Sequence, residues 1–164
     1  MTPESVRKYL LRSYMAVDGL WFMKVEKRFG FDAALDLDAG VWEVMAKIQA
    51  RELKAALGES SGISALRSCF EQKCSIEGFV CVFQEGRNGF DVRIEGCHWY
   101  DKMIKAGREH LAATIGNRIC ATEYAVWASE FGCSFGFGGE KKICEGGVEC
   151  LLRFEEIQNR PPMI

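Results

Sequence analysis

The side chains best suited to chemistry are four cysteines in the second half of the chain, Cys97, Cys120, Cys144 and Cys150. Each lies at an expected boundary between elements, where the backbone can turn a side chain inward. A structural zinc site takes four ligands in tetrahedral geometry from thiolate, imidazole or carboxylate groups. Glu140 supplies a carboxylate shortly before Cys144. The pattern predicts zinc held by Cys120, Cys144, Cys150 and either Glu140 or Cys97.

The directions expected for three of these cysteines support one shared site. A helix expected to begin at Cys120 places this thiol on the same face as Tyr124 and Trp127. A helix N-terminus also lowers the pKa of a thiol, which favours the thiolate that a metal needs. Cys144 and Cys150 flank a glycine turn that can bring them together. Five residues separate these two cysteines, a wider spacing than in common zinc knuckles.

Cys97 and His98 raise a second possibility, an enzyme. Strand alternation places Cys97 on the solvent side unless Gly96 forms a bulge that redirects it. A hydrolase of a small heterocyclic or amide-like substrate would use Cys97 or a metal-activated water as nucleophile, with His98 or Glu123 as the base. A catalytic zinc keeps one coordination position open, so this hypothesis predicts three protein ligands. A third hypothesis is an iron–sulfur site that uses all four cysteines.

The remaining cysteines and the nearby aromatic residues have simpler interpretations. Small buried hydrophobic roles are expected for Cys69, Cys74, Cys81 and Cys133. Aromatic residues near the candidate ligands belong either to the core or to the lining of a pocket for a small apolar or heterocyclic molecule. The residues in question are Trp99, Tyr124, Trp127 and Phe135.

The elements that must position these residues follow from hydrophobic periodicity. Helices are expected over 3–29, 39–57 (capped by Asp38), a third from Ser61 or Ser64 through Phe70, 100–115 (closed by Gly116) and 120–131. Strands are expected over 78–83, 90–95 (with Phe90, Val92 and Ile94 on one face), 134–137 or 141–143, and 150–157. Segregated runs of helices and strands predict an α+β domain, with an antiparallel sheet of four or five strands covered by helices. The chain is expected to be one domain: a helical part (1–73), an α+β core (75–157) and a tail (158–164).

Composition excludes several classes of function. The 164 residues carry a net charge of −2 with both signs interspersed, so we expect no nucleic-acid partner and no anionic membrane partner. The amino terminus lacks the apolar core of a secretory signal, and no apolar run is long enough to cross a bilayer, so a cytoplasmic protein is expected. The first helix has a wide apolar stripe that either the domain or a second subunit must cover, and we expect a homodimer.

The pattern of Cys120, Glu140, Cys144 and a glycine turn leading to Cys150 resembles the 4-vinyl-reductase-type domain, over about residues 75–157. The resemblance implies an α+β fold shared with TRAPP vesicle-tethering subunits. It also implies binding of small apolar molecules and zinc held by three cysteines and a glutamate.

The segment Cys97-His98-Trp99, followed by Gly107-Arg108-Glu109, Ile119-Cys120 and Glu123-Tyr124, is more similar to the family named after L-2-amino-thiazoline-4-carboxylate hydrolase and its prokaryotic relatives. This likeness extends over most of the chain. Two departures bear on the role of Glu140. Gly146-Gly147 stands where the usual pattern has Gly-Asp, and the last two cysteines are closer together than in the 4-vinyl-reductase-type domains that act as sensor modules of transcription activators.

Overall fold

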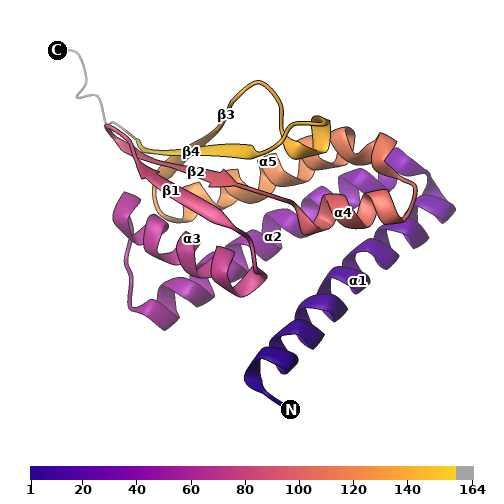
Figure 1. Cartoon of the computed structure of the whole chain (residues 1–164), viewed down its shortest axis with the longest axis horizontal. Helices are drawn as coiled ribbons and strands as arrows, with labels where there is room; N and C mark the ends of the chain where they lie inside the picture. The colour runs from indigo at the N-terminus through magenta and orange to yellow at the C-terminus, as the bar shows by residue number, and fades with distance from the viewer. Residues whose placement is uncertain (158–164) are drawn as a thin grey trace.

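Long helices and one antiparallel sheet make up residues 1–157, the part of the chain that this computed structural model describes (Figure 1). The elements are α1 (Pro3–Phe29), α2 (Phe31–Leu57), α3 (Ile63–Glu77), β1 (Cys81–Glu85), β2 (Gly89–Ile94), α4 (His98–Lys105), η1 (Glu109–Leu111), α5 (Ala112–Glu130), β3 (Cys133–Gly138), η2 (Ile143–Glu145) and β4 (Cys150–Glu156). The expected α+β class is confirmed: three helices come first, and α4 and α5 separate the two halves of a four-stranded antiparallel sheet in the chain order. The predicted tail, 158–164, lies outside the described residues.

The sheet has the strand order β1-β2-β4-β3, and every neighbouring pair is antiparallel. The inner face carries Phe90 and Val92 from β2 and Leu152 and Phe154 from β4, all buried. This face packs against α3 and α5, as the alternation of apolar residues along β2 predicts. In the register of β2 with β4, Ile94 lies opposite Cys150. The end of β2 and the start of β4 therefore meet at one edge of the core.

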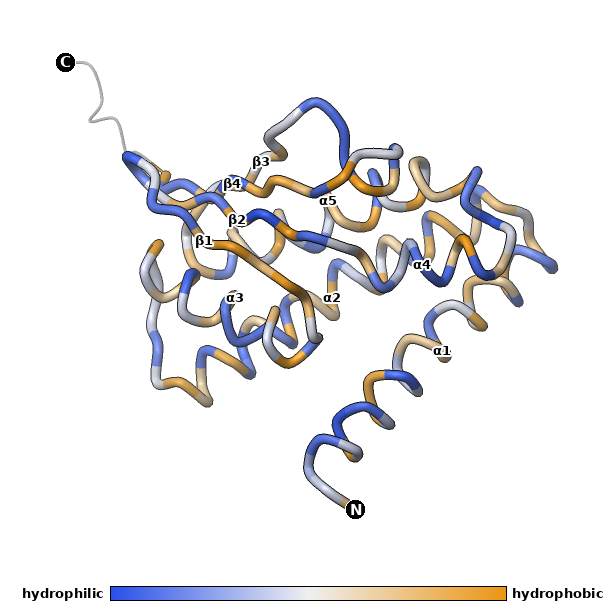
Figure 2. Tube along the Cα trace, in the orientation of Figure 1, coloured by the Kyte–Doolittle hydropathy of each residue, from blue (hydrophilic) through white to orange (hydrophobic). Residues whose placement is uncertain are grey.

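The first two helices form a hairpin whose arms separate toward the amino terminus (Figure 1). Gly30 joins them with a φ of +91°, a conformation that favours glycine. Along its length α2 packs against α5, whereas the first half of α1 stands away from the main body (Figure 1). Apolar residues recur along both arms of the hairpin, including the sides that face solvent (Figure 2).

The expectation that Asp38 caps the second helix is wrong. The helix begins directly after Gly30, so Asp38 lies about two turns inside α2 and only 5% of it is exposed. Burial raises the pKa of Asp38 from 3.8 to about 7, and the negative charge of Asp18 on α1 adds to the effect. Periodicity alone could not reveal this, because an aspartate before an apolar run also matches a helix start.

Wild-type protein is expected to lose stability between pH 4 and pH 7 through Asp38. Since the folded-state pKa lies above the unfolded value of 3.8, the folded state binds more protons in this window, and stability falls as pH rises. The loss at pH 8 is about 2–4 kcal/mol. Asp38→Asn should remove that part of the dependence, measured by urea unfolding at pH 5 and pH 8. An unchanged difference between the two pH values in the variant would contradict it.

Candidate functional site

Four thiols gather where β2 ends and β4 begins. Cys97 caps α4, Cys120 lies on α5, Cys144 belongs to η2, and Cys150 is the first residue of β4. Cys97, Cys144 and Cys150 all lie close enough to Cys120 that a thiolate at any of them would raise its pKa, and Cys97 has the same effect on both Cys144 and Cys150. Four elements that are well separated in the sequence thus bring the four cysteines singled out from the sequence into one neighbourhood.

Two of the sulfur atoms accept hydrogen bonds from the backbone. The Tyr100 amide donates to Cys97 Sγ at 3.5 Å, and the Ile143 amide donates to Cys150 Sγ at 3.4 Å. Gly96, with a φ of +109°, turns the chain after β2 has ended at Ile94, so strand alternation no longer decides where Cys97 points. Amide donors stabilise the charged form of a thiol, so both contacts favour a thiolate.

Cys120 does not begin a helix, contrary to expectation. One helix, α5, runs from Ala112 to Glu130, and the break expected at Gly116 occurs earlier, at Gly107, which has a φ of +66°. Gly116 does not end a helix but lies buried inside α5, where there is no room for a side chain. A Cβ atom there would lie 2.9 Å from Cys144 Sγ and 3.0 Å from Cys144 Cβ, so glycine lets η2 approach the helix. Cys120 lies one turn further along the same face.

The four thiols hold protons more tightly than free cysteine does. Burial raises the pKa of Cys120 well above 9.0, and nearby negative charge, including that of the other three thiols, adds to this. Burial, with Cys150 and Glu145, raises the pKa of Cys144 to about 11. Burial also raises the pKa of Cys97 and Cys150, against the effect of the backbone amides. The lowered pKa expected for Cys120 at a helix start is therefore not found.

The donor set and the sulfur positions give different answers on metal binding. Four thiols from four elements match the soft ligands that zinc prefers in structural sites. Within residues 1–157, however, no group of three or more histidine, cysteine, aspartate or glutamate side chains is placed so that it could hold a metal ion as it stands.

Glu140 and His98 lie apart from the thiols. Glu140 is exposed in the loop after β3, and the largest influences on the pKa values of the four cysteines come from other groups. His98 points the other way along α4, where its Nε2 lies 2.9 Å from the Gly78 carbonyl oxygen and its ring stacks on Phe79 with centroids 5.4 Å apart.

Glu123 belongs to a buried ion-pair network that sequence reasoning did not find. Its carboxylate lies 2.9 Å from Lys73 Nζ, which also lies 2.5 Å from the Glu77 carboxylate. Burial alone would lower the pKa of Lys73, but Glu123 and Glu77 outweigh it and raise that pKa. A signal was present in the sequence: Lys73 falls between Phe70 and Cys74 on the apolar face of α3. Glu123 is therefore paired with a cation.

The four aromatic residues considered as pocket lining are divided between two clusters. Tyr124 and Trp127 are buried in the main core, where the partly buried Phe135 also packs. Trp99 packs in the second cluster, with Phe22 and Ile119 among its members. The cleft between α1 and α4 and the shallow cleft along the first half of α1 are not lined by any of these four aromatic residues.

The fold and the site together define a small α+β domain with four thiols at one end of its sheet. The chain belongs to a family of unknown function, DUF6125, whose model matches residues 6–130. The matched region includes Cys97 and Cys120 and ends before Cys144 and Cys150. No curated protein matches, and no solved structure matches. The resemblance to the 4-vinyl-reductase-type and aminothiazoline-carboxylate hydrolase families stays a prediction.

In the described part of the chain, no helix combines the length and the apolar character needed to span a membrane.

Proposed function

We propose that the chain is a metal-binding domain in which Cys97, Cys120, Cys144 and Cys150 hold a soft cation, zinc first. The observation that carries the proposal is the meeting of four thiols from four elements, two of them already accepting backbone amide hydrogens. Cys97 is preferred to Glu140 as the fourth ligand, since Glu140 is exposed whereas Cys97 lies close enough to influence the pKa of the other three thiols. The metal would tie α4, α5, η2 and β4 together.

A structural role has more support than a catalytic one. Four protein thiolates close the coordination shell of zinc, whereas a catalytic zinc needs an open position for water. The bases that a hydrolase would use have other partners, because His98 contacts the Gly78 carbonyl and Glu123 pairs with Lys73. The hydrolase hypothesis therefore ranks second. All eight cysteines are free thiols in the structure, and we propose a cytoplasmic location, where thiols stay reduced and available to a metal.

Elemental analysis of freshly purified protein, prepared without chelators, tests the proposal together with an absorption spectrum. One zinc per chain and no visible absorption would support it. Iron with sulfide and visible absorption would favour the iron–sulfur alternative at the same four cysteines. Protein that is folded, contains neither metal, and takes up no zinc on dialysis would refute the proposal.

We also propose that the chain forms a homodimer through α1 and α2. Several large apolar side chains on solvent-facing sides of these helices are more than a third exposed, including Leu20 and Trp21 on α1 and Val41 and Val44 on α2. Apolar surface of this extent on two adjacent helices is typical of an interaction surface. A second copy is the simplest occupant, because a twofold interface places the same patch on both subunits.

The dimer should be weakened by a charge within this surface. Leu20→Glu is expected to raise the dissociation constant at least about tenfold, because a carboxylate would have to be buried on association. Val82→Glu on β1 is a matched control, since Val82 is exposed and lies opposite Arg93 in the sheet. Sedimentation equilibrium measures both. A monomeric wild-type protein, or equal effects of the two substitutions, would contradict the proposed interface.

A further inference from the structure

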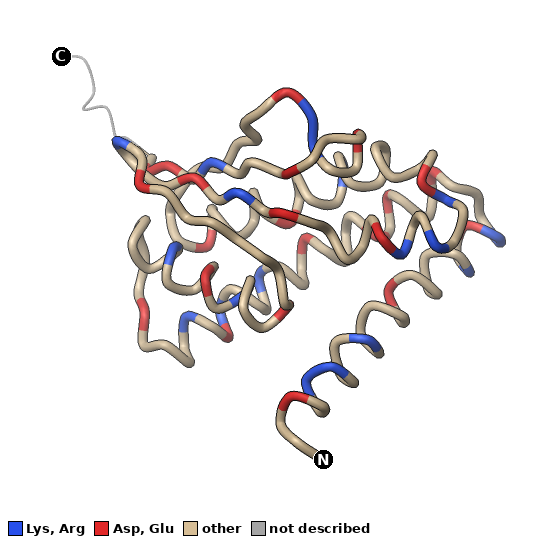
Figure 3. The backbone as a smooth tube through the Cα atoms, in the orientation of Figure 1, with Lys and Arg blue, Asp and Glu red and all other residues tan. Residues whose placement is uncertain are grey.

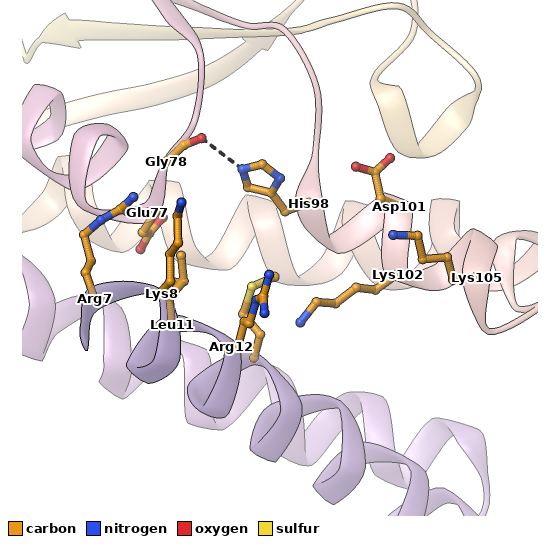
Figure 4. Close-up of a pocket in the computed structure, with 11 residues that line it drawn as sticks. Arg7, Lys8, Leu11, Arg12, Glu77, Gly78, His98, Asp101, Lys102 and Lys105 are labelled. Carbon is orange, nitrogen blue, oxygen red and sulfur yellow. Dashed lines mark hydrogen bonds between the residues drawn. The ribbon is translucent and has the colours of Figure 1, made fainter. Parts of the chain in front are cut away.

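A charged cleft lies between the first half of α1 and the end of α3 with α4 (Figure 4). Its volume is about 400 Å³, within the range of small-molecule sites. Five lysine or arginine side chains and two carboxylates line it, an excess of three positive charges (5 − 2). The whole chain has a net charge of −2, so this excess is local. Basic residues along the first half of α1 and on α4 produce it (Figure 3).

Part of this charge is already neutralised. Arg7 pairs with Glu4 at 2.9 Å, and Lys8 lies 3.4 Å from the same carboxylate. Glu77, one of the two lining acids, pairs with the buried Lys73. Glu77 therefore contributes little net negative charge to the cleft, and Arg7 and Lys8 contribute little net positive charge.

Three lining cations remain without such a partner. Among residues 1–157, no ion pair is formed by Arg12 on α1 or by Lys102 and Lys105 on α4. Arg12 and Lys102 point toward each other from opposite walls (Figure 4). Asp101 is the second lining acid, and the three cations outnumber it. Like charges that face each other in this way create a position where an anion is attracted from both sides.

The other walls supply shape and apolar contact. Leu11 and Met15 of α1 line the cleft, and both are partly buried. The ring of His98 is held at the end of the cleft by the Gly78 carbonyl and by stacking on Phe79. His98, Asp101, Lys102 and Lys105 recur at helical spacing on one side of α4. Cys97, the cap of the same helix, belongs to the thiol cluster, so the thiols and the cleft share α4 as a common wall.

We propose that this cleft binds a small organic anion, with its carboxylate or phosphate between Arg12, Lys102 and Lys105 and its apolar body on Leu11 and Met15. The head group can accept charge-assisted hydrogen bonds from the guanidinium and ammonium groups. A volume of about 400 Å³ favours a small molecule over a polymer. The proposal goes beyond metal binding, and it can fail while the thiol site is correct, because none of the four cysteines lines the cleft.

Isothermal titration calorimetry with phenyl phosphate and with benzoate, at constant ionic strength in chloride, tests the proposal on the protein as purified. Binding of either probe to wild-type protein supports it, and the tighter of the two identifies the head group. The double variant Arg12→Gln/Lys102→Gln should bind at least tenfold more weakly. The matched control Lys24→Gln/Lys27→Gln removes two exposed lysines of α1 that do not line the cleft, and it should bind as wild type does.

Three outcomes would overturn the proposal. The first is that wild-type protein binds neither probe. The second is that the cleft variant and the control variant lose affinity equally, which would indicate a general charge effect. The third is binding of a short single-stranded oligonucleotide but of neither small anion, which would indicate a polyanion surface. Circular dichroism of both variants establishes that the helices are intact in each comparison.

Discussion

Replacing Cys144 by serine is expected to remove the bound metal and to lower the melting temperature by roughly 10 °C. A serine hydroxyl is a poor zinc ligand, and three remaining thiolates hold the ion much less tightly. Because a structural site exists only in the folded state, its binding energy is also folding energy. A loss of only about 3 kcal/mol corresponds to a shift of this size in a chain of 164 residues. Zinc stoichiometry and calorimetric melting measure the two effects together.

Cys81→Ser is a suitable control for this substitution, because Cys81 is also partly buried but lies on β1, two strands away from Cys150 in the sheet, with Cys74 as its nearest thiol partner. It should leave the metal content unchanged. Gly116→Ala provides a second test that removes no ligand. Its Cβ atom would displace Cys144 from the surface of α5, so the metal should be lost more readily to a chelator. A Cys144→Ser protein with full metal content and an unchanged melting temperature would show that the thiols do not form a metal site.

Local sequence patterns predicted the elements better than they predicted helix boundaries. Alternation along Phe90–Ile94 identified both the strand and its buried face, because one side of the sheet is solvated. Gly116 was misread as a helix end, since a glycine that makes room for Cys144 looks the same in sequence as a glycine that terminates a helix. Asp38 was misread for a similar reason, because a buried acid and a helix cap share one residue type.

The candidate site could be predicted in its members but not in its arrangement. Cysteine type and spacing selected Cys97, Cys120, Cys144 and Cys150, and these four lie close enough to influence one another, but within residues 1–157 they are not placed to hold a metal ion as they stand. Which way Cys97 points depends on the turn at Gly96, and that turn depends on where β2 stops pairing with β4. The basic cleft was not predicted, because its charges come from α1 and α4 and no local pattern relates the two helices.

Lys73→Met is expected to destabilise the protein by about 3–5 kcal/mol at pH 8. Lys73 is only 5% exposed and is the cation that Glu123, itself 7% exposed, needs as a partner. Removing one member of a buried ion pair leaves an uncompensated charge, and that charge, more than the lost attraction, accounts for the cost. Guanidinium unfolding at constant pH measures the change. Glu77 is less affected, because its side chain is 18% exposed and can reach water.

The pH dependence of Lys73→Met distinguishes the cost of an uncompensated charge on Glu123 from a simple loss of packing. Burial raises the pKa of Glu123, and Lys73 partly opposes the rise, so without Lys73 the carboxyl group should hold its proton to a higher pH. A raised folded-state pKa in a carboxyl group costs stability as pH rises through it, so the deficit of Lys73→Met should shrink from pH 8 to pH 5. Lys73→Met/Glu123→Leu should recover most of the loss, because it buries no unpaired charge. A deficit that is equal at both pH values and unchanged in the double variant would mean that the network contributes only through packing.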